Sequence, residues 1–443
     1  MIIQTSQPIE LIREIFPDGN FKVTLRGNIN DLGRNMLDSE ENIQLVTNNV
    51  GTAITELALD NYDINEPYIC VGNEKYYKKG AFPQTYETSF GSITLTRSVY
   101  QSADGGKQYC PLEVDAGLVN NATPKFAKIV SSKSARMGAP AVEADLLESN
   151  GRKISKRYVK TIMDSIGRLA LEKQTTWTYG ESLEVDKKDV ASLSLGVDGT
   201  CMFLINGGGW REAMVATISL FDANGNRLHT IYLGAEPEHG KERFLALVDK
   251  EWNRIREKYP NAVTQGLADG ATWIWNWLTE RTDYQLLDFF HMYEYVAKAA
   301  VAIFKTEEEQ ENFKAFWCHY IKHYSSGGKK LVEELEKIVQ GQSRKIDKAA
   351  LRIVIEYLKN QADRLNYRRE YQAGRPIGSG ITEAACKQLI KARMCQAGMR
   401  WKLEGAANVI AVRSLLLTYG RWEQFWYKTM RHGGYQKLMA RAA

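Results

Sequence analysis

The stretch that decides the fold is SLSLGVDGT, residues 192–200. Leu193, Leu195 and Val197 alternate with small residues, which is the period-2 pattern of a half-buried strand. The pattern leads to Asp198, although strands disfavour aspartate, so this side chain needs a turn, a partner or a function to explain it. An isolated Asp-Gly pair usually begins a turn. Asp198 becomes a candidate site residue only if other carboxylates lie near it.

The sequence after this strand predicts a mixed α/β layer. Turn signals at 207–209 and at Asn224-Gly225 separate two further alternating runs, so three consecutive antiparallel strands are expected. The elements expected next are a helix at 240–259, a strand ending at Asp269, a helix at 271–281 and a strand reaching Asp288. The order β-β-β-α-β-α-β predicts one mixed sheet with helices on its faces.

Composition excludes several classes of protein. The 443 residues are 44% hydrophobic and 25% charged, which is typical of a globular chain and not of a disordered or fibrous one. No apolar run reaches the roughly 18 residues of a membrane span, and the first residues lack the pattern of a secretory signal, so we expect a cytoplasmic protein. The six cysteines form no CxxC pair, which argues against a disulfide framework or a cysteine zinc finger. The net charge of +5 permits an anionic partner without requiring one.

A basic helix precedes the predicted sheet. Residues 121–173 predict three helices joined by tight turns, and the third lies in a stretch, 152–173, that is rich in lysine and arginine. Helix-turn-helix proteins place such a helix in the major groove of DNA. We therefore expect Lys156, Arg157 and Lys160 to contact DNA, and the alternative is an ordinary solvated helix face.

A third candidate carboxylate lies in RPIGSGITEAACKQLIKARM, residues 375–394. The loop at 376–380 leads into a basic helix, and Glu383 falls in its first turn, where the helix dipole favours a carboxylate. By itself such a glutamate is an ordinary helix-start residue. Two carboxylates on neighbouring strands, Asp198 and Asp269, would repel each other unless a cation such as Mg²⁺ lay between them, and Glu383 is the candidate third ligand.

Seven motifs occur along the chain in one order: GVDGT, GWREAMVATISLFD, YLGAEPEHGK, GLADGATWIW, LLDFFH, PIGSGITEAACK and GMRWKLEGA. Together they resemble the DDE transposases of ISKra-type bacterial insertion sequences, relatives of the Mutator-like group, over about residues 86–428. The resemblance implies a ribonuclease H-like catalytic core with the acidic triad Asp198, Asp269 and Glu383, which would bind two Mg²⁺ or Mn²⁺ ions. It also implies cleavage of phosphodiester bonds at the ends of the element and joining of the freed 3′ hydroxyls to target DNA.

The resemblance also implies the domain organisation. The stretch between Asp269 and Glu383 is longer than the core fold needs, and transposases of this kind often carry a helical insertion there. The expected regions are a mainly helical start at 1–85 without an assigned role, a small antiparallel β-sheet at 86–120, helix-turn-helix-like DNA-binding helices at 121–185, the first part of the core at 186–304, an all-α insertion at 305–374, and the catalytic Glu helix with a helical tail at 375–443.

Further residues are expected to support the site. Asp288 and His291 match a family pattern of a cysteine or aspartate, two intervening residues and then histidine, and we expect them to support the catalytic acids from outside the metal site. Trp317, in the insertion, is a candidate for stacking on an unpaired base. The basic residues expected to hold the DNA backbone near the acids are Lys387, Lys391, Arg393, Arg400 and Lys402.

The expected partners are double-stranded DNA at the element's ends and in the target, and further copies of the chain bound to DNA, with no membrane. Two alternatives remain open from the sequence. A ribonuclease H-like nuclease or resolvase would use the same carboxylates to cut without strand transfer. A DNA-binding regulator derived from a transposase would bind the ends without cutting them, and such a regulator usually lacks a residue of the triad.

Overall fold

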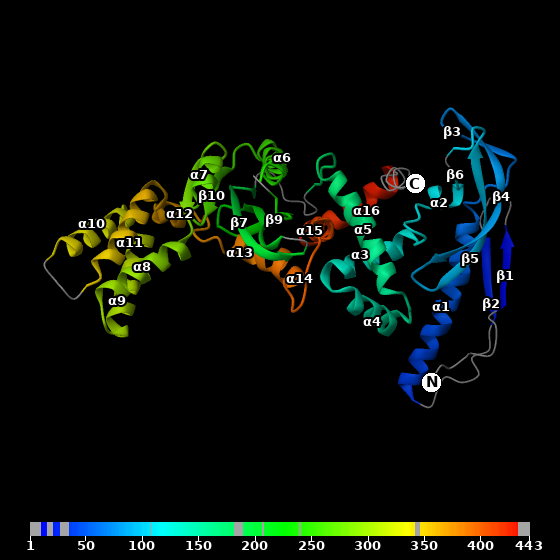
Figure 1. Cartoon of the computed structure of the whole chain (residues 1–443), viewed down its shortest axis with the longest axis horizontal. Helices are drawn as coiled ribbons and strands as arrows, with labels where there is room; N and C mark the ends of the chain where they lie inside the picture. The colour runs from blue at the N-terminus through cyan, green and yellow to red at the C-terminus, as the bar shows by residue number, and fades with distance from the viewer. Residues whose placement is uncertain are drawn as a thin grey trace. The chain divides into compact units, whose positions relative to one another are not determined.

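The computed structural model describes residues 10–15, 21–26, 35–106, 108–180, 189–205, 208–238, 241–341 and 346–432. The chain forms two compact units. Unit 1 comprises Met1–Ala170 with Phe425–Ala443, and unit 2 comprises Leu171–Gln424. Figure 1 labels their helices and strands. Among the described helices, none combines the length and the apolar character that crossing a bilayer requires.

Unit 1 begins with β-structure and one long helix. Its first elements are β1 (Glu10–Ile15), β2 (Phe21–Arg26), α1 (Met36–Asp60), β3 (Tyr68–Val71), β4 (Glu74–Glu87), β5 (Ser92–Ser102), β6 (Gln108–Tyr109) and α2 (Pro111–Asp115). Strands β1 and β2 pair with each other, and β3 to β6 form an antiparallel sheet in chain order. The expected small sheet therefore starts at residue 68 and not at 86, and α1 is the only described helix within 1–85. The alternation of apolar and polar residues did not predict most of β4. Tyr86 is the only buried side chain of this strand, so its sequence has no need of apolar residues at every second position.

Three helices follow in unit 1, as the sequence predicts for residues 121–173. They are α3 (Pro124–Arg136), α4 (Ala139–Asn150) and α5 (Lys156–Lys173). Helix α4 ends at Gly151, whose φ of 62° is a left-handed conformation that glycine adopts without strain. The hydroxyl of Ser155 accepts a hydrogen bond from the backbone N–H of Tyr158 and so caps the start of α5.

Unit 2 contains a five-stranded mixed sheet, which confirms the mixed α/β class expected from the sequence. Its elements are β7 (Ser192–Leu204), β8 (Gly209–Phe221), β9 (Arg227–Ala235), α6 (Glu242–Lys258), β10 (Val263–Ala268), α7 (Thr272–Thr279) and β11 (Tyr284–Leu287). The strand order across the sheet is β11-β10-β7-β8-β9. Strands β7, β8 and β9 are antiparallel, whereas β10 runs parallel to β7 and β11 parallel to β10.

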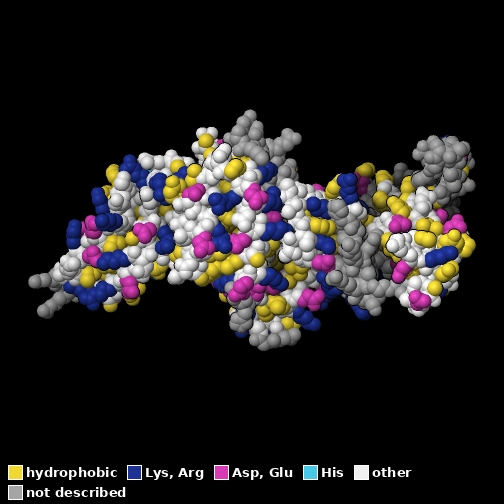
Figure 2. All heavy atoms as spheres, turned by 90° about the horizontal axis from the view of Figure 1, so that it is seen from above, with side chains coloured by type: hydrophobic (Ala, Val, Ile, Leu, Met, Phe, Trp, Pro, Cys, Tyr) yellow, Lys and Arg dark blue, Asp and Glu magenta, His cyan; other side chains and the backbone are white. Residues whose placement is uncertain are grey.

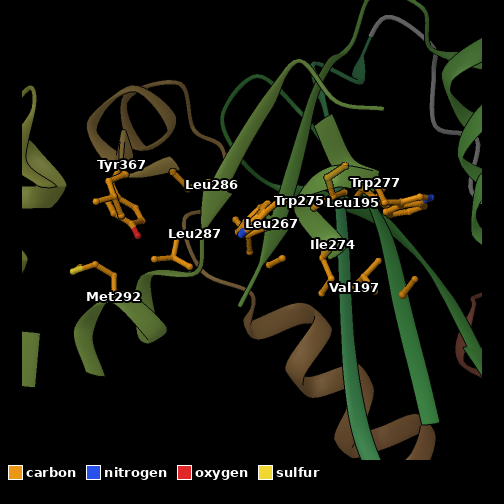
Figure 3. Close-up of a cluster of buried hydrophobic side chains, with 14 of the residues drawn as sticks. Leu195, Val197, Leu267, Ile274, Trp275, Trp277, Leu286, Leu287, Met292 and Tyr367 are labelled. Carbon is orange, nitrogen blue, oxygen red and sulfur yellow. The ribbon is translucent and has the colours of Figure 1, made fainter. Parts of the chain in front are cut away.

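The core of unit 2 fixes this sheet. Figure 3 shows side chains from strands and helices meeting in one apolar cluster. The labelled members are Leu195, Val197, Leu267, Ile274, Trp275, Trp277, Leu286, Leu287, Met292 and Tyr367, all of them buried. Each large apolar side chain contributes about 1.5–3 kcal/mol when it is fully buried. The strand residues just before Asp198 and Asp269 are thus held in place by their packing in this core.

A helical subdomain follows β11; it begins with α8 at Phe289, before the all-α insertion expected at 305–374, because α8 packs against α9 and α11. Its elements are α8 (Phe289–Ile303), α9 (Glu307–His323), α10 (Gly327–Gln340), α11 (Lys348–Asn360), the 3-10 turn η2 (Ala362–Arg364) and α12 (Tyr367–Gln372). Figure 2 shows many Lys and Arg side chains on the face of this subdomain that is in view. The chain ends with α13 (Gly380–Ala385), the π-helical segment η3 (Cys386–Lys391), α14 (Ala392–Met394), α15 (Leu403–Leu417) and α16 (Arg421–His432).

Candidate active site

Asp198 lies within β7, and Asp269 directly follows the neighbouring strand β10. In the parallel pairing of β7 with β10, Leu267 is the partner of Gly196. This pair is the last one of the register, and Asp198 and Asp269 each lie two residues beyond it, Asp269 just after the end of β10. Neighbouring strands are about 4.8 Å apart, and side chains two residues apart point to the same face. The negative charge of Asp269 accordingly acts on Asp198 and contributes to raising its pKa.

The carboxyl group of Asp198 is largely shielded from water. Its Oδ1 accepts a hydrogen bond of 2.7 Å from the backbone N–H of Gly199, and its Oδ2 accepts one of 3.4 Å from the thiol of Cys386. Burial is the largest cause of its raised pKa, because an apolar environment disfavours the charged form. Without a cation nearby, the ionised form of Asp198 is therefore costly.

Helix α13 packs directly onto the strand that carries Asp198. A Cβ atom added to Gly196 would overlap Oγ1 of Thr382, and this oxygen lies 2.7 Å from Oγ1 of Thr217 on the adjacent strand. Gly196 and Asp198 share a face of β7, and Cys386, one helical turn after Thr382, contacts Asp198. Gly196, the first glycine in GVDGT, thus lets the helix that carries Glu383 approach the strand of Asp198.

Glu383 itself is half exposed and has a partner on its own helix. Its Oε1 lies 2.6 Å from Nζ of Lys387, one turn along. The hydrogen bond and charge of Lys387 are the largest causes that lower the pKa of Glu383, and the charges of His291 and Lys391 act in the same direction. His291 also acts electrostatically on Asp198, so the surroundings of Glu383 and Asp198 overlap.

The helix of Glu383 contains a π-helical segment directly after the glutamate's turn. Residues Cys386–Lys391 form it, and the buried guanidinium of Arg413 on α15 donates hydrogen bonds to the carbonyls of Gln388 and Leu389. Wide turns of this kind leave carbonyls without their usual helical donors and occur frequently at functional sites. Arg413, which lies on another helix, supplies hydrogen-bond donors to two of these carbonyls.

Asp288 holds the loop in front of Glu383. Its carboxylate is buried and caps α8 by accepting from the backbone N–H of Phe290. It also accepts from the N–H of Ser379 at 3.1 Å and from the Ser379 hydroxyl at 2.7 Å. Since Ser379 immediately precedes α13, Asp288 fixes the start of the Glu383 helix. This contact is of the kind expected for a supporting residue, whereas His291 is partly exposed and lies 3.7 Å from Glu294.

The donor set fits a hard divalent cation in its chemistry. Carboxylate oxygens are the ligands that Mg²⁺ and Mn²⁺ prefer, and two adjacent carboxylates gain most from a cation between them. Within the described ranges, however, no group of three or more His, Cys, Asp or Glu side chains converges as a metal-binding group. The carboxylate of Asp198 instead accepts from Cys386, and that of Glu383 pairs with Lys387. Of the three acids, Asp198 and Asp269 act on each other electrostatically.

The expected DNA-contacting residues divide into exposed and buried ones. Those with exposed side chains are Lys156, Arg157, Lys160, Lys387, Lys391, Arg400 and Lys402. Arg393 differs from the expectation, because it is only 5% exposed and its guanidinium lies 4.9 Å from the ring centre of Trp401. Burial lowers the pKa of Arg393 to about 10. It faces inward on its helix and is a packing residue in this structure.

Trp317 is also placed differently from the expectation. Its side chain is 8% exposed, and its ring packs against those of Phe313, Phe316 and Tyr320. It shares the inward face of α9 with Ile321, four residues later, which is buried as well. Trp317 is thus a core residue of the helical subdomain and is not accessible to a DNA base.

Sequence reasoning missed several residues around the acids. Besides Cys386 and Thr382, Tyr357 of α11 donates from its hydroxyl to the carbonyl of Asp269 at 3.1 Å. Gly270 makes this approach possible, since its φ is 108° and an added Cβ would lie 2.5 Å from that hydroxyl. A glycine directly after a strand-end acid is a sequence signal for close approach, but it does not say which residue approaches.

Comparison with known proteins adds no assignment: no protein-family model matches this chain, and no curated protein matches it.

Proposed function

We propose that this protein is a DNA transposase of the DDE type, which binds insertion-sequence ends, cleaves phosphodiester bonds and joins the 3′ hydroxyl ends to target DNA. The observation that carries the proposal is that Asp198 and Asp269 each lie two residues beyond the paired residues Gly196 and Leu267 of two neighbouring parallel strands, and that the charge of Asp269 acts on Asp198. The strand order supports a ribonuclease H-like core, a fold in which the first acid lies on the first strand and the second at the end of the fourth. Here those positions belong to Asp198 and Asp269.

In the proposed mechanism Asp198, Asp269 and Glu383 would hold the divalent cations. The ions would supply activation of the attacking hydroxyl and stabilisation of the leaving oxygen in an in-line displacement at phosphorus. The first displacement adds water to the phosphorus and frees a 3′ hydroxyl, and the second adds that hydroxyl to a target phosphate and breaks one target P–O bond. No covalent bond between protein and DNA is needed.

The remaining residues position the DNA and the acids. Lys391, Arg400 and Lys402 are exposed beyond the Glu383 turn, where cationic side chains attract the phosphate backbone. Asp288 and Thr382 hold the helix of Glu383 against the sheet. The cost of ionising the partly buried Asp198 favours cation binding, because a cation compensates the charge that desolvation disfavours.

The test uses the full chain and DNA that flanks its gene, including the short inverted repeats that a mobile element would have. A pre-cut end with a free 3′ hydroxyl is incubated with supercoiled plasmid and Mg²⁺ or Mn²⁺, and cleaved and joined products are separated. Joined product supports the proposal. Cleavage without joining indicates a nuclease or resolvase, and binding without either reaction indicates a regulator.

Asp198→Asn is the matched control in this test. It keeps the size of the side chain and removes one negative charge from the acid pair. We expect both cleavage and joining to fall by at least about a hundredfold, while binding of the ends in a gel-shift assay persists. Undiminished cleavage by this variant would contradict the assignment of the acidic site.

A further inference from the structure

Three aromatic rings form a stacked row at the end of helix α9. Phe316 and Tyr320 lie four residues apart on one face of the helix, and Tyr324 is the extended residue that directly follows its last turn. The ring centres of Phe316 and Tyr320 are 5.8 Å apart with an angle of 22° between the planes, and those of Tyr320 and Tyr324 are 4.6 Å apart with 11°. We refer to these three residues as the aromatic row.

The aromatic row is open to solvent, unlike the neighbouring core residue Trp317. Phe316 is 57% exposed and Tyr324 is 50% exposed, and Tyr320 between them is partly exposed. Tyr371 of α12, close by, is 46% exposed and has Nζ of Lys322 4.2 Å from its ring centre. Large apolar rings that gather on a surface usually mark a binding site. None of these rings has a part in the acidic site.

Lysines outnumber acids along the segment that carries the aromatic row, although Glu311 pairs with Lys314 and Glu333 acts on Lys330. The stretch from Asn312 to Val332 contains no aspartate or glutamate. Its lysines are Lys314, Lys322, Lys329 and Lys330. Nζ of Lys330 donates to the hydroxyl of Tyr320 at 2.8 Å, which fixes this cation at the edge of the row. The surface therefore combines flat apolar faces with positive charge and suits a polyanion that carries flat rings.

We propose that the aromatic row binds unpaired nucleotides of a DNA strand, with bases stacking on the outer faces of its two end rings, Phe316 and Tyr324, and phosphates beside the lysines. Every nucleobase has an aromatic face, so stacking on aromatic side chains tolerates any sequence, and lysines beside it hold the backbone. In a duplex these faces are covered by neighbouring base pairs, so the row favours single-stranded over double-stranded DNA. The inference rests on the proposed function in one respect, namely that DNA is the substrate.

Binding is measured with the full chain in the presence of EDTA, so that no cleavage occurs. The probes are a fluorescein-labelled 12-nucleotide oligothymidylate and a labelled 12-base-pair duplex, followed by fluorescence anisotropy. The test variants are Phe316→Leu and Tyr324→Leu, which keep an apolar side chain and remove the ring. Both positions are exposed, so folding is preserved, and circular dichroism checks this. The matched control is Ile353→Ala, at an exposed apolar residue of α11 in the same subdomain.

We expect each ring variant to weaken binding of the oligothymidylate about tenfold and to leave duplex binding within about twofold of the wild type. The control should bind both probes as the wild type does. Lys330→Gln should weaken oligothymidylate binding and reduce its dependence on salt. Unchanged oligothymidylate binding in both ring variants overturns the inference, and so does an equal loss for single-stranded and duplex DNA.

Two further results separate this inference from its alternatives. If the ring variants change the sedimentation of the protein without DNA and leave oligothymidylate binding intact, the row is a contact between copies of the chain and the inference is wrong. If oligothymidylate binding depends on the rings but the wild type neither cleaves nor joins DNA, the proposed function fails and the aromatic row stands. If joining occurs and the rings do not affect binding, only the inference fails.

Discussion

Helix α13 meets strand β7 at Gly196, where Thr382 fills the space that a side chain would occupy. This contact lies two residues before Asp198 on the strand and one residue before Glu383 on the helix. Because the carbonyls and amides of β7 are paired on both sides with β8 and β10, the strand cannot shift to admit a larger residue. The distance between the carboxylates of Asp198 and Glu383 therefore depends on Gly196.

The first prediction concerns Gly196→Ala. The added methyl group must displace Thr382, and overpacking of this kind costs about 1–3 kcal/mol. We expect the melting temperature to fall and cleavage to fall more strongly, because the helix of Glu383 moves away from Asp198. The matched control is Gly380→Ala in the same helix, where an added Cβ meets nothing within 4 Å. Thr382→Ala in the Gly196→Ala background should restore part of the activity, and its failure to do so would contradict the steric explanation.

The second prediction is that Asp198→Asn stabilises the protein without divalent ions. Burial and then the charge of Asp269 raise the pKa of Asp198 above its ordinary value of 3.8. A carboxyl group with a raised folded-state pKa destabilises the fold as the pH rises from the unfolded pKa through the folded one, since the unfolded chain releases the proton more readily. In EDTA at pH 7 the variant should therefore melt at a higher temperature than the wild type, and the difference should shrink on acidification.

Asp222→Asn is the control of opposite sign. The pKa of Asp222 is lowered, mainly by hydrogen bonding from Asn226, so its ionised form favours the folded state. Its replacement should lower the melting temperature at pH 7. Added Mg²⁺ should raise the melting temperature of the wild type more than that of Asp198→Asn. A wild type that is as stable as Asp198→Asn in EDTA at every pH would refute the electrostatic account of the acid pair.

The third prediction tests whether Glu383 leaves Lys387 to join the cation. The exposed ion pair between them contributes up to about 1 kcal/mol, which competes with metal binding. Lys387→Gln should thus bind Mn²⁺ about two- to fivefold more tightly in calorimetric titration. Lys391→Gln removes an equal charge without releasing Glu383 and should have a smaller effect. An equal gain in both variants would mean that charge alone, and not the release of Glu383, is responsible.

The fourth prediction concerns the exposed basic face of α5. Replacing Lys156, Arg157 and Lys160 together with alanine should weaken binding of the element's ends, because each lost phosphate contact reduces counterion release by about 0.9 in the salt slope. For three contacts we expect the slope to fall by about 2 to 3. Lys79→Ala, at an exposed position on β4, should change neither affinity nor slope. An unaltered slope in the triple variant would show that this face does not contact phosphates.

The sheet of unit 2 was predictable because its strands obey local rules. The alternation before Asp198 and the Asn224-Gly225 turn depend on neighbours in sequence, and each element they predict is present. The expected end of the first strand at Asp198 was wrong, because β7 continues to Leu204 through its pairing with β8 and Asp198 lies in the middle of it.

Residues whose placement depends on distant partners could not be predicted in this way. Trp317 and Arg393 lie on helices whose inward face is set by packing, and the sequence alone does not distinguish a buried aromatic from its exposed neighbour Phe316. The π-helical segment requires hydrogen bonds from Arg413, more than twenty residues away along the chain. Strand β4 lacks the apolar period because unit 1 buries little of it.

The π-helical segment Cys386–Lys391 changes the direction in which side chains point after it, relative to those before it on the same helix. Successive residues of an α-helix turn by about 100°, so in a regular helix the direction of Glu383 would dictate that of Lys391 and Arg393. A wide turn accommodates one additional residue, and the two ends then point in directions that are set independently. The first half follows the sheet, through Thr382, and the second half follows the core around Trp401. A one-residue deletion within the segment would consequently rotate the lysine end against the glutamate end, and the protein would lose the alignment of phosphate backbone and carboxylates while keeping every one of these side chains.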